Sequence, residues 1–209
     1  MINKVNSIEN NIQELKNKNN KLEKEIENLK NNTKSRIDNA IIKDEELNLI
    51  EEAIKNKFHT NIKRYELLLR GSRDGFHSNN FHQKCDGKNN TITFILTKYG
   101  RRFGGFTEAT WDQSGQWKKY PNSFIFSLDN KEILYIKNNV NCILCYKNGN
   151  PNFLGFGEGH LFKLYNNCNE NNCSYDNSGV IFETNGKKYA LAGSYNFSVK
   201  DYEVFQLLL

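Results

Sequence analysis

Proline is scarce in this sequence: only Pro121 and Pro151 occur among 209 residues, so no proline-rich linker is expected. No run approaches the roughly 18 apolar residues that a membrane-spanning helix needs. The short apolar stretch typical of a secretory signal peptide is also missing from the charged N-terminal segment. We therefore expect a cytoplasmic protein without membrane insertion, whose five cysteines are reduced thiols.

Positive charge is in mild excess but is not gathered in one place. The formal net charge is +5, from 29 basic and 24 acidic residues. Residues 1–36 contain eight basic and five acidic residues, so both parts of the chain share the excess. Proteins that bind nucleic acid usually cluster Lys and Arg along one face. Nucleic-acid binding is therefore not expected, and a nucleic-acid-binding regulator is kept only as an alternative function.

Residues 1–36 carry a heptad repeat with apolar residues at its first and fourth positions. The seam of this repeat comprises Val5, Ile8, Ile12, Leu15, Asn19, Leu22, Ile26 and Leu29. β-Branched residues at the first position with leucine at the fourth favour a coiled coil of two parallel helices, and a single Asn19 in the seam sets register and oligomeric state. We predict a parallel coiled coil that forms a homodimer. The alternative is a helix that packs on the chain's own domain.

Residues 37–43 are expected to connect the coil to one domain at 44–209. Asp44 is a candidate N-cap, and apolar residues recur at helical spacing from there to about Lys57. A short helix is also predicted at 79–84. These features place one or two helices in the domain, next to a much longer β-rich part.

From Tyr65 onward the apolar pattern has a period of two, which is typical of strands. The strand-like runs are Tyr65–Leu69, Thr91–Thr97, Ser123–Leu128, Ile133–Ile136, Asn141–Tyr146, Phe153–Phe156, His160–Leu164, Val180–Glu183, Tyr189–Ala192 and Tyr202–Leu207. Asp129-Asn130, Asn148-Gly149 and Asn185-Gly186 predict tight turns between neighbouring strands. The pattern predicts an α+β fold, with a β-sandwich of two antiparallel sheets and flanking helices.

Several segments of the domain occur in an order that resembles a known family. They are 70–76 (RGSRDGF), 81–88 followed by the strand at 91–96, 103–107 with Trp111, 123–128, 155–159 and 202–205. The chain from about Ile42 to Leu208 thereby resembles the TLDc domain family. The positions that carry the resemblance are Arg70, Ser72, Arg73, Asp74, Gly75, Phe76, Cys85, Asp86, Gly104, Gly105, Phe106, Gly155 and Gly157. Glu158 and the loop 166–175 depart from the family pattern.

The resemblance implies a β-sandwich and a role in protection against oxidative stress. In several relatives it also implies binding to the proton-pumping vacuolar ATPase. It attaches no catalytic reaction to the family, so no enzymatic activity, cofactor or metal is expected. It says nothing about the N-terminal coil, which lies outside the family domain.

Arg70, Arg73 and Asp74 lie beside glycines where a strand ends, and two interpretations are open. The loop can present charge to a partner, or it can be structural. In the structural case Asp74 caps the turn and an arginine pairs with Asp86.

The thiols suggest alternative chemistries. His82 and Cys85 would share a helix face, as a hydrolytic or thiol enzyme would need, but no oxyanion-hole signature accompanies them. Cys142 and Cys145 with Cys168 and Cys173 would supply four zinc ligands. However, residues three apart in a strand face opposite sides, so no zinc site is predicted. Cys168 and Cys173 alone are candidates for a redox pair in an exposed polar loop.

The glycine-rich segment 155–159 is not expected to bind phosphate. It lacks the Lys and Ser/Thr of a P-loop, and a strand rather than a helix follows it. A tight turn is predicted instead.

Overall fold

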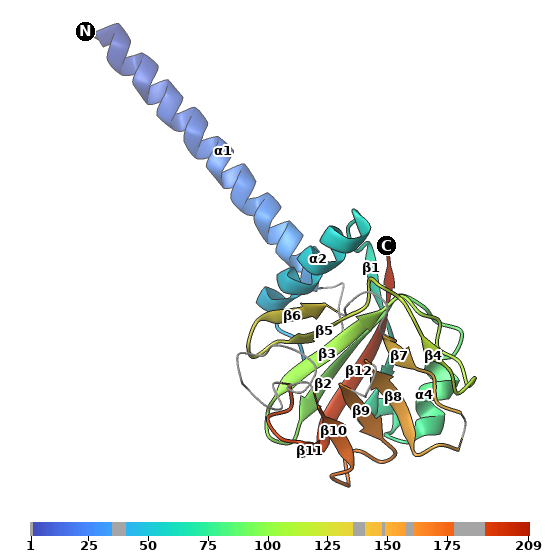
Figure 1. Cartoon of the computed structure of the whole chain (residues 1–209). Coiled ribbons are helices and arrows are strands. Elements are labelled where there is room, and N and C mark those ends of the chain that lie inside the picture. The colour runs from blue at the N-terminus through green and yellow to red at the C-terminus, as the bar shows by residue number, and fades with distance from the viewer. Residues whose placement is uncertain (1, 35–40, 136–140, 148, 158–160, 178–190) are drawn as a thin grey trace. The chain divides into compact units, whose positions relative to one another are not determined.

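The structure is a computed structural model of the chain. It describes residues 2–34, 41–135, 141–147, 149–157, 161–177 and 191–209. The chain divides into two compact units, Met1–Asp38 and Asn39–Leu209. The first unit contains one long helix, α1 (Ile2–Lys34), drawn in blue in Figure 1. The helical character predicted for this segment is confirmed.

The second unit is built from two six-stranded sheets, counted over the described residues. The first sheet has the strand order β1 (Arg64–Arg70), β12 (Val199–Leu208), β2 (Thr91–Thr97), β3 (Arg102–Thr107), β5 (Phe124–Ser127) and β6 (Glu132–Tyr135). The second has the order β11 (Asn196–Phe197), β10 (Ser174–Asp176), β9 (Phe162–Tyr165), β8 (Asn152–Phe156), β7 (Ile143–Leu144) and β4 (Trp117–Lys118). Every neighbouring pair is antiparallel. The predicted α+β class with two antiparallel sheets is confirmed.

The two sheets share one hydrophobic core made largely of aromatic rings. Phe103 of the first sheet packs edge-on against Phe162 of the second, with ring centroids 5.3 Å apart. Phe156 stacks on Phe162 at 5.0 Å. Aromatic pairs of this kind add to the stability that burial of their surface already provides. This shared core holds the ends of the strands, and therefore the loops, in fixed positions.

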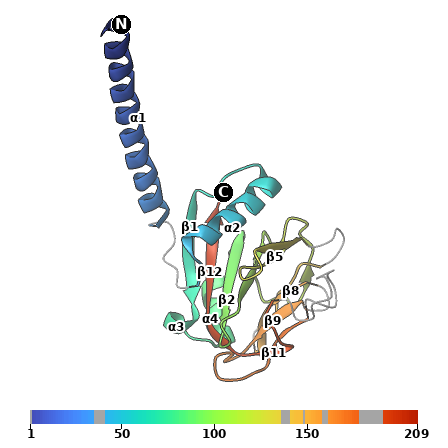
Figure 2. The same cartoon turned by 90° about the vertical axis from the view of Figure 1, so that its left-hand side faces the viewer.

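The central strands of the first sheet are buried on both faces, because the helix α2 (Asp44–Phe58) covers the face that points away from the second sheet (Figure 2). Phe58 of α2 packs on Phe106 at 5.6 Å. Arg102 of β3 binds Glu46 of α2 through two hydrogen bonds of 2.7 and 2.8 Å. Strands β2, β3 and β5 consequently show almost unbroken runs of buried residues instead of strict alternation.

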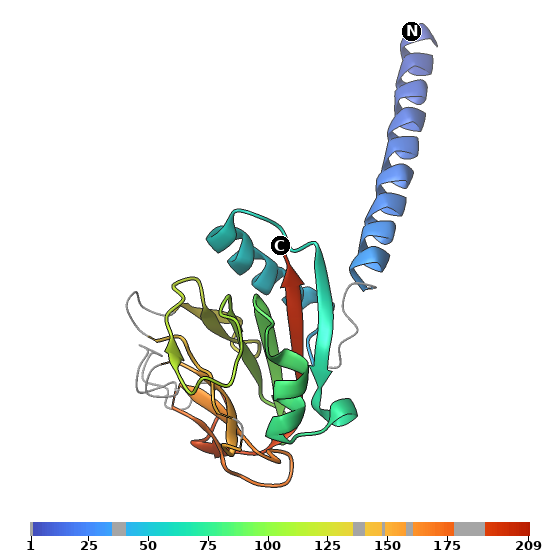
Figure 3. The same cartoon turned by 90° about the vertical axis from the view of Figure 1, so that its right-hand side faces the viewer.

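Two shorter helices follow β1. Helix α3 (Gly71–Asp74) begins where β1 ends, and α4 (Ser78–Cys85) lies beside β1 and β8, one strand from each sheet (Figure 3). The helix predicted at 79–84 is therefore confirmed. Asp44 is the first residue of α2 rather than its cap: Lys43 precedes the helix, and its N–H donates to Glu46 Oε2 at 2.9 Å. Asp44, Glu45 and Glu46 lie in the first turn of α2, where the helix dipole favours acidic side chains.

Most of the predicted strands occur with shifted ends, and β2 has the predicted bounds. Four strands were not predicted: β3, β4, β10 and β11. Leu191 and Ala192, the described end of a predicted strand, form a turn instead. The Asp129-Asn130 turn between β5 and β6 is confirmed. The predicted strand at 180–183, the Asn185-Gly186 turn, Asn148 and Glu158 lie outside the described residues.

Candidate functional site

The end of β1 and the segment that follows it are held by ion pairs and hydrogen bonds to each other and to β12. Arg70 Nε donates to Glu203 Oε1 at 2.7 Å, and the Glu203 side chain is fully buried. Asp74 accepts from the backbone N–H of Arg70 at 2.9 Å and from Arg73 Nη2 at 2.7 Å. The hydrogen bond from Arg73 lowers the pKa of Asp74. Arg70 and Asp74 therefore support the fold, whereas the Arg73 side chain is half exposed.

Ser72 fastens α3 to the start of β12. Its N–H and its hydroxyl donate to the two carboxylate oxygens of Asp201, at 2.9 and 2.6 Å. Gly71 leaves no room for a Cβ atom, which would lie 2.6 Å from Phe76 and 2.8 Å from Tyr202. The signature residues of this segment thus form a close-packed joint between β1 and β12.

No arginine that the structure describes forms the expected ion pair with Asp86. Asp86 instead accepts from Gln113 Nε2 at 2.7 Å and lies 3.0 Å from His82 Nδ1. The turn that contains Asp86 pairs with Trp111, whose carbonyl accepts from Gly87 N at 2.8 Å. Arg70 pairs with Glu203 instead, and Arg73 pairs with Asp74.

The signature glycines are positions where neighbouring rings come close to the backbone. A Cβ on Gly104 would lie 2.7 Å from the ring of Phe126, and one on Gly105 would lie 2.6 Å from the ring of Phe156. Gly157 ends β8 with a φ of +75°, which favours glycine. Gly155 is an internal residue of β8. The β8 strand is followed by β9, as the turn interpretation requires.

The thiols do not form the centres that their spacing suggested. Cys85, Cys142, Cys145 and Cys168 are buried, and only Cys173 is exposed. Burial raises the pKa of each buried thiol, to about 11 for Cys145 and to about 12 for Cys168. A thiol nucleophile or redox sensor needs the opposite, a lowered pKa and access to solvent. The expectation that Cys168 lies in an exposed loop is therefore wrong.

The geometry also does not support a catalytic His82–Cys85 pair or a zinc site at Cys142 and Cys145. Cys85 follows His82 on α4, but the His82 ring is directed at Asp86 through Nδ1 rather than paired with the thiol. Cys142 and Cys145 flank the two-residue strand β7 and both reach the interior. Among the described residues, no group of three or more His, Cys, Asp or Glu is arranged to hold a metal ion.

The seam of α1 is apolar and open to solvent in the single chain. Ile12, Leu15, Leu22 and Ile26 are between 46% and 65% exposed. Asn19 is exposed as well, and its side-chain amide lies 3.5 Å from Glu23 on the same helix. Lys18 pairs with Glu14 along the same helix at 3.3 Å. The seam residues whose side chains are described thus form an exposed apolar stripe that a single Asn interrupts.

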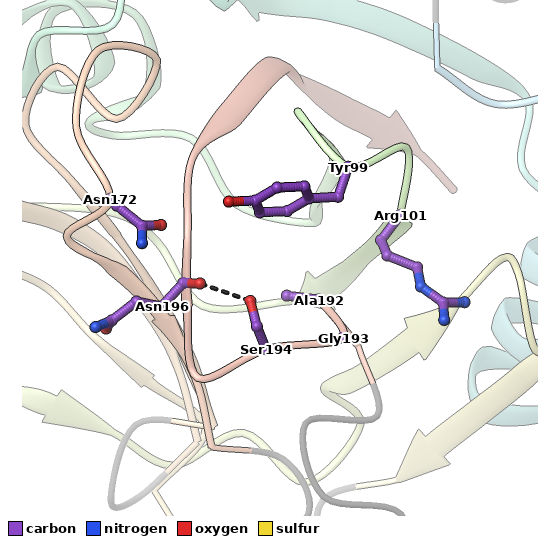
Figure 4. Close-up of a pocket in the computed structure, with 7 residues that line it drawn as sticks. All are labelled: Tyr99, Arg101, Asn172, Ala192, Gly193, Ser194 and Asn196. Carbon is purple, nitrogen blue, oxygen red and sulfur yellow. Dashed lines mark hydrogen bonds between the residues drawn. The ribbon is translucent and has the colours of Figure 1, made fainter.

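A surface pocket of about 420 Å³ lies where the loops at one end of the two sheets meet. Its lining consists of Tyr99, Arg101, Asn172, Ala192, Gly193, Ser194 and Asn196. In Figure 4 the hydroxyl end of the Tyr99 ring points towards Asn172, and Arg101 lies at the other end of the pocket. Tyr99 is 70% exposed, which is unusual for so large a ring.

The sequence interpretation missed this pocket entirely. Its lining comes from the β2–β3 turn, the loop before β10 and the segment around β11, and no pattern links these three segments along the chain. The one available signal was Tyr99-Gly100 between two strands, a turn that carries an aromatic side chain where polar residues are usual.

The domain therefore consists of two stacked antiparallel sheets and a covering helix, with polar residues such as Arg70 and Ser72 holding β1 and α3 to β12. Residues 35–208 match the TLDc domain, so the chain belongs to the TLDc family. TLDc domains are associated with resistance to oxidative stress and are generally non-catalytic. A comparison with curated proteins found no match to this chain. No described helix is long and apolar enough to cross a membrane.

Proposed function

We propose that this protein is a non-enzymatic interaction protein that protects cells against oxidative stress. The observation that carries the proposal is the match of residues 35–208 to the TLDc domain. The burial of Cys85, Cys142, Cys145 and Cys168 supports it, because thiols with raised pKa values are poor scavengers of oxidants. Protection would then come from what the domain binds rather than from a reaction that it performs.

The partner that we propose is the vacuolar proton ATPase, by its association with the family. The test is capture of purified vacuolar ATPase by the immobilised full chain, together with survival of peroxide-treated cells that express the chain. Concentration-dependent capture supports the proposal. Failure to capture the ATPase at micromolar protein refutes this partner, and unchanged survival refutes the protective role.

We further propose that α1 forms a parallel two-stranded coiled coil, so that the protein presents its TLDc domain in two copies. The support is the exposed apolar stripe, because fully burying a Leu or Ile side chain contributes about 1.5–3 kcal/mol. Asn19 within the stripe favours two chains over larger assemblies. Two linked domains bind a repeated partner more tightly than one, without any new contact.

The oligomeric state has a direct test in light scattering of the full chain. The wild type should show twice the 24.4 kDa mass of one chain. Leu15→Lys with Leu22→Lys should give single chains, because two charges per helix then enter the seam. Asn17→Lys with Asn20→Lys adds the same charge outside the seam and should leave the dimer intact. A wild type that stays monomeric at micromolar concentration contradicts the proposal.

A further inference from the structure

The pocket at the β2–β3 turn has an unbalanced positive charge. None of its seven lining residues is acidic, and Arg101 is one of them. Lys98 precedes the turn, is exposed, and its N–H donates to the carbonyl of Ser198 at 2.9 Å, which places it beside the start of β12. Lys200 is exposed on that strand, while the acid nearest to the lining in sequence is the exposed Glu170. Arg101 is the charged residue among the seven that line the pocket, so the lining itself favours a negatively charged ligand.

Arg101 differs from three of the four other arginines that the structure describes, Arg64 being the exception. Arg70, Arg73 and Arg102 each form an ion pair with a carboxylate at 2.7 Å. The guanidinium of Arg101 has no such partner among the described residues, although its backbone N–H donates to Thr97 at 3.0 Å. Its side chain lies against Gly193, where a Cβ would be 3.3 Å from Nε. A guanidinium on a fixed turn without an acid is suited to bind a carboxylate with two parallel hydrogen bonds.

Three of the other polar side chains of the pocket are also unengaged, whereas the Ser194 hydroxyl donates to the carbonyl of Asn196 at 2.6 Å. The side-chain amides of Asn172 and Asn196 and the hydroxyl of Tyr99 make no hydrogen bond to any described residue. An Asn amide offers one acceptor and two donors, which complements the N–H and C=O of a peptide group. The exposed face of the Tyr99 ring adds an apolar surface across the pocket (Figure 4).

The backbone around the pocket is held in place before any ligand arrives. The fully buried carboxylate of Asp176 accepts from Leu191 N at 3.0 Å and from Ala192 N at 2.7 Å. Thr97 N donates to the carbonyl of Arg101 at 2.9 Å and closes the β2–β3 turn. A site that is formed in advance loses less conformational entropy on binding.

We propose that this pocket binds an extended acidic peptide segment of a protein partner, with Arg101 on a carboxylate and the Asn172 and Asn196 amides on peptide groups. The volume of about 420 Å³ is within the range of ligand pockets and well above that of one small anion. The amides, the Tyr99 ring and the guanidinium are spaced along the pocket, an arrangement that fits an extended peptide better than a single small anion. The inference rests on the proposed interaction role and assigns it a surface and a class of partner.

The test is fluorescence anisotropy of a fluorescein-labelled peptide of alternating glutamate and serine, titrated with the full-length protein. Arg101→Gln should weaken binding about tenfold, which corresponds to 1.4 kcal/mol, because it removes the guanidinium that binds a peptide carboxylate. The matched control is Arg64→Gln, since Arg64 is also exposed and lies at the start of β1. This control should show no comparable loss. Tyr99→Ala should weaken binding as well.

Three outcomes overturn the inference. Equal binding by the Arg101 and Arg64 variants would place the site elsewhere, and equal binding of a peptide with glutamine in place of glutamate would remove the need for acid. Tighter, Arg101-dependent binding of a single-stranded oligonucleotide would make the ligand a nucleic acid. Both arginines are exposed, so unchanged thermal midpoints should show that neither variant unfolds the domain.

The same variants separate this inference from the proposed function. Capture of the vacuolar ATPase by the wild type but not by Arg101→Gln supports both proposals. Capture that survives Arg101→Gln overturns the pocket's role in that interaction and leaves the proposed function standing. If the wild type captures no ATPase, the proposed partner is wrong, while Arg101-dependent peptide binding still supports an acidic ligand.

Discussion

The ion pair between α2 and β3 allows a quantitative test of how the helix is held on the sheet. Arg102 donates two hydrogen bonds to Glu46, and its Nε lies 3.3 Å from Asp129 Oδ1. The Arg102 and Glu46 side chains are only 17% and 7% exposed, so solvent screens the pair weakly. Breaking a buried pair by removing one member costs about 3–5 kcal/mol, because the other charge is left without a partner.

We expect Arg102→Leu to lower the free energy of unfolding by about 3 kcal/mol, near the lower limit because Glu46 still accepts from Lys43 N. Glu46→Gln keeps that acceptor and leaves Arg102 with Asp129, so its cost should be about 2 kcal/mol. In the double variant Glu46 is no longer a stranded charge and Asp129 keeps its hydrogen bond from the Arg102 backbone N–H, so the loss should stay near 3 kcal/mol. The coupling energy of the pair is then about 2 kcal/mol.

The assay is urea unfolding followed by tryptophan fluorescence. Trp111 and Trp117 both lie in the domain, so the signal reports on the sheets and not on α1. For a domain of this size, a loss of 3 kcal/mol lowers the melting temperature by about 6–12 °C. Additive single losses, with coupling below about 0.5 kcal/mol, would refute the reasoning, since they would mean that water screens the pair as it does at an open surface.

Three further outcomes are expected. Gly105→Ala should cost about 1–3 kcal/mol in the same urea assay, because the added methyl overlaps the Phe156 ring; an unchanged midpoint would mean that this ring moves freely. With an aromatic disulfide reagent, one thiol should react quickly in the native protein and four only after unfolding, and Cys173→Ser should abolish the fast phase; two fast thiols would contradict the burial pattern. Burial opposes ionisation of Asp112, but Lys118 and a neighbouring serine outweigh it and lower the pKa of Asp112 from 3.8 to about 2. The ionised Asp112 therefore stabilises the fold above about pH 4, and this contribution is lost as the pH falls through 2. Asp112→Asn should therefore flatten the decline of the urea midpoint between pH 4 and pH 2. Parallel pH profiles for the wild type and the variant would argue against the ion pair with Lys118.

The strands that could be predicted are those whose residue types favour strands. The run of alternating Thr and bulky apolar residues at 91–97 gave β2 its predicted bounds. Strand β3 was missed because Gly104 and Gly105 weaken any strand pattern. A Cβ on Gly104 would overlap the Thr93 carbonyl, and one on Gly105 would overlap the Phe156 ring. Strands β4 and β11 have two residues each, too few to show a period.

The candidate sites were less predictable than the fold, because their contacts join distant parts of the chain. Arg70 was identified as a turn residue, but its partner Glu203 is 133 positions away. Nothing in the local sequence distinguishes that acid from Asp86, the partner predicted from proximity. Burial of Cys168 likewise depends on how its loop folds back on β12, where Val199 N donates to the Cys168 carbonyl at 2.8 Å.

The position of β12 has a consequence for biosynthesis. This strand lies second in its sheet, between β1 and β2, and pairs with both along most of its length. During synthesis β1 leaves the ribosome long before β12, so the edge of β1 that pairs with β12 has no partner strand for most of translation, and its apolar side chains stay exposed. Chaperones that bind nascent chains would therefore act mainly during that interval, and a chain that ends just short of residue 199 would lack the strand that joins β1 to β2.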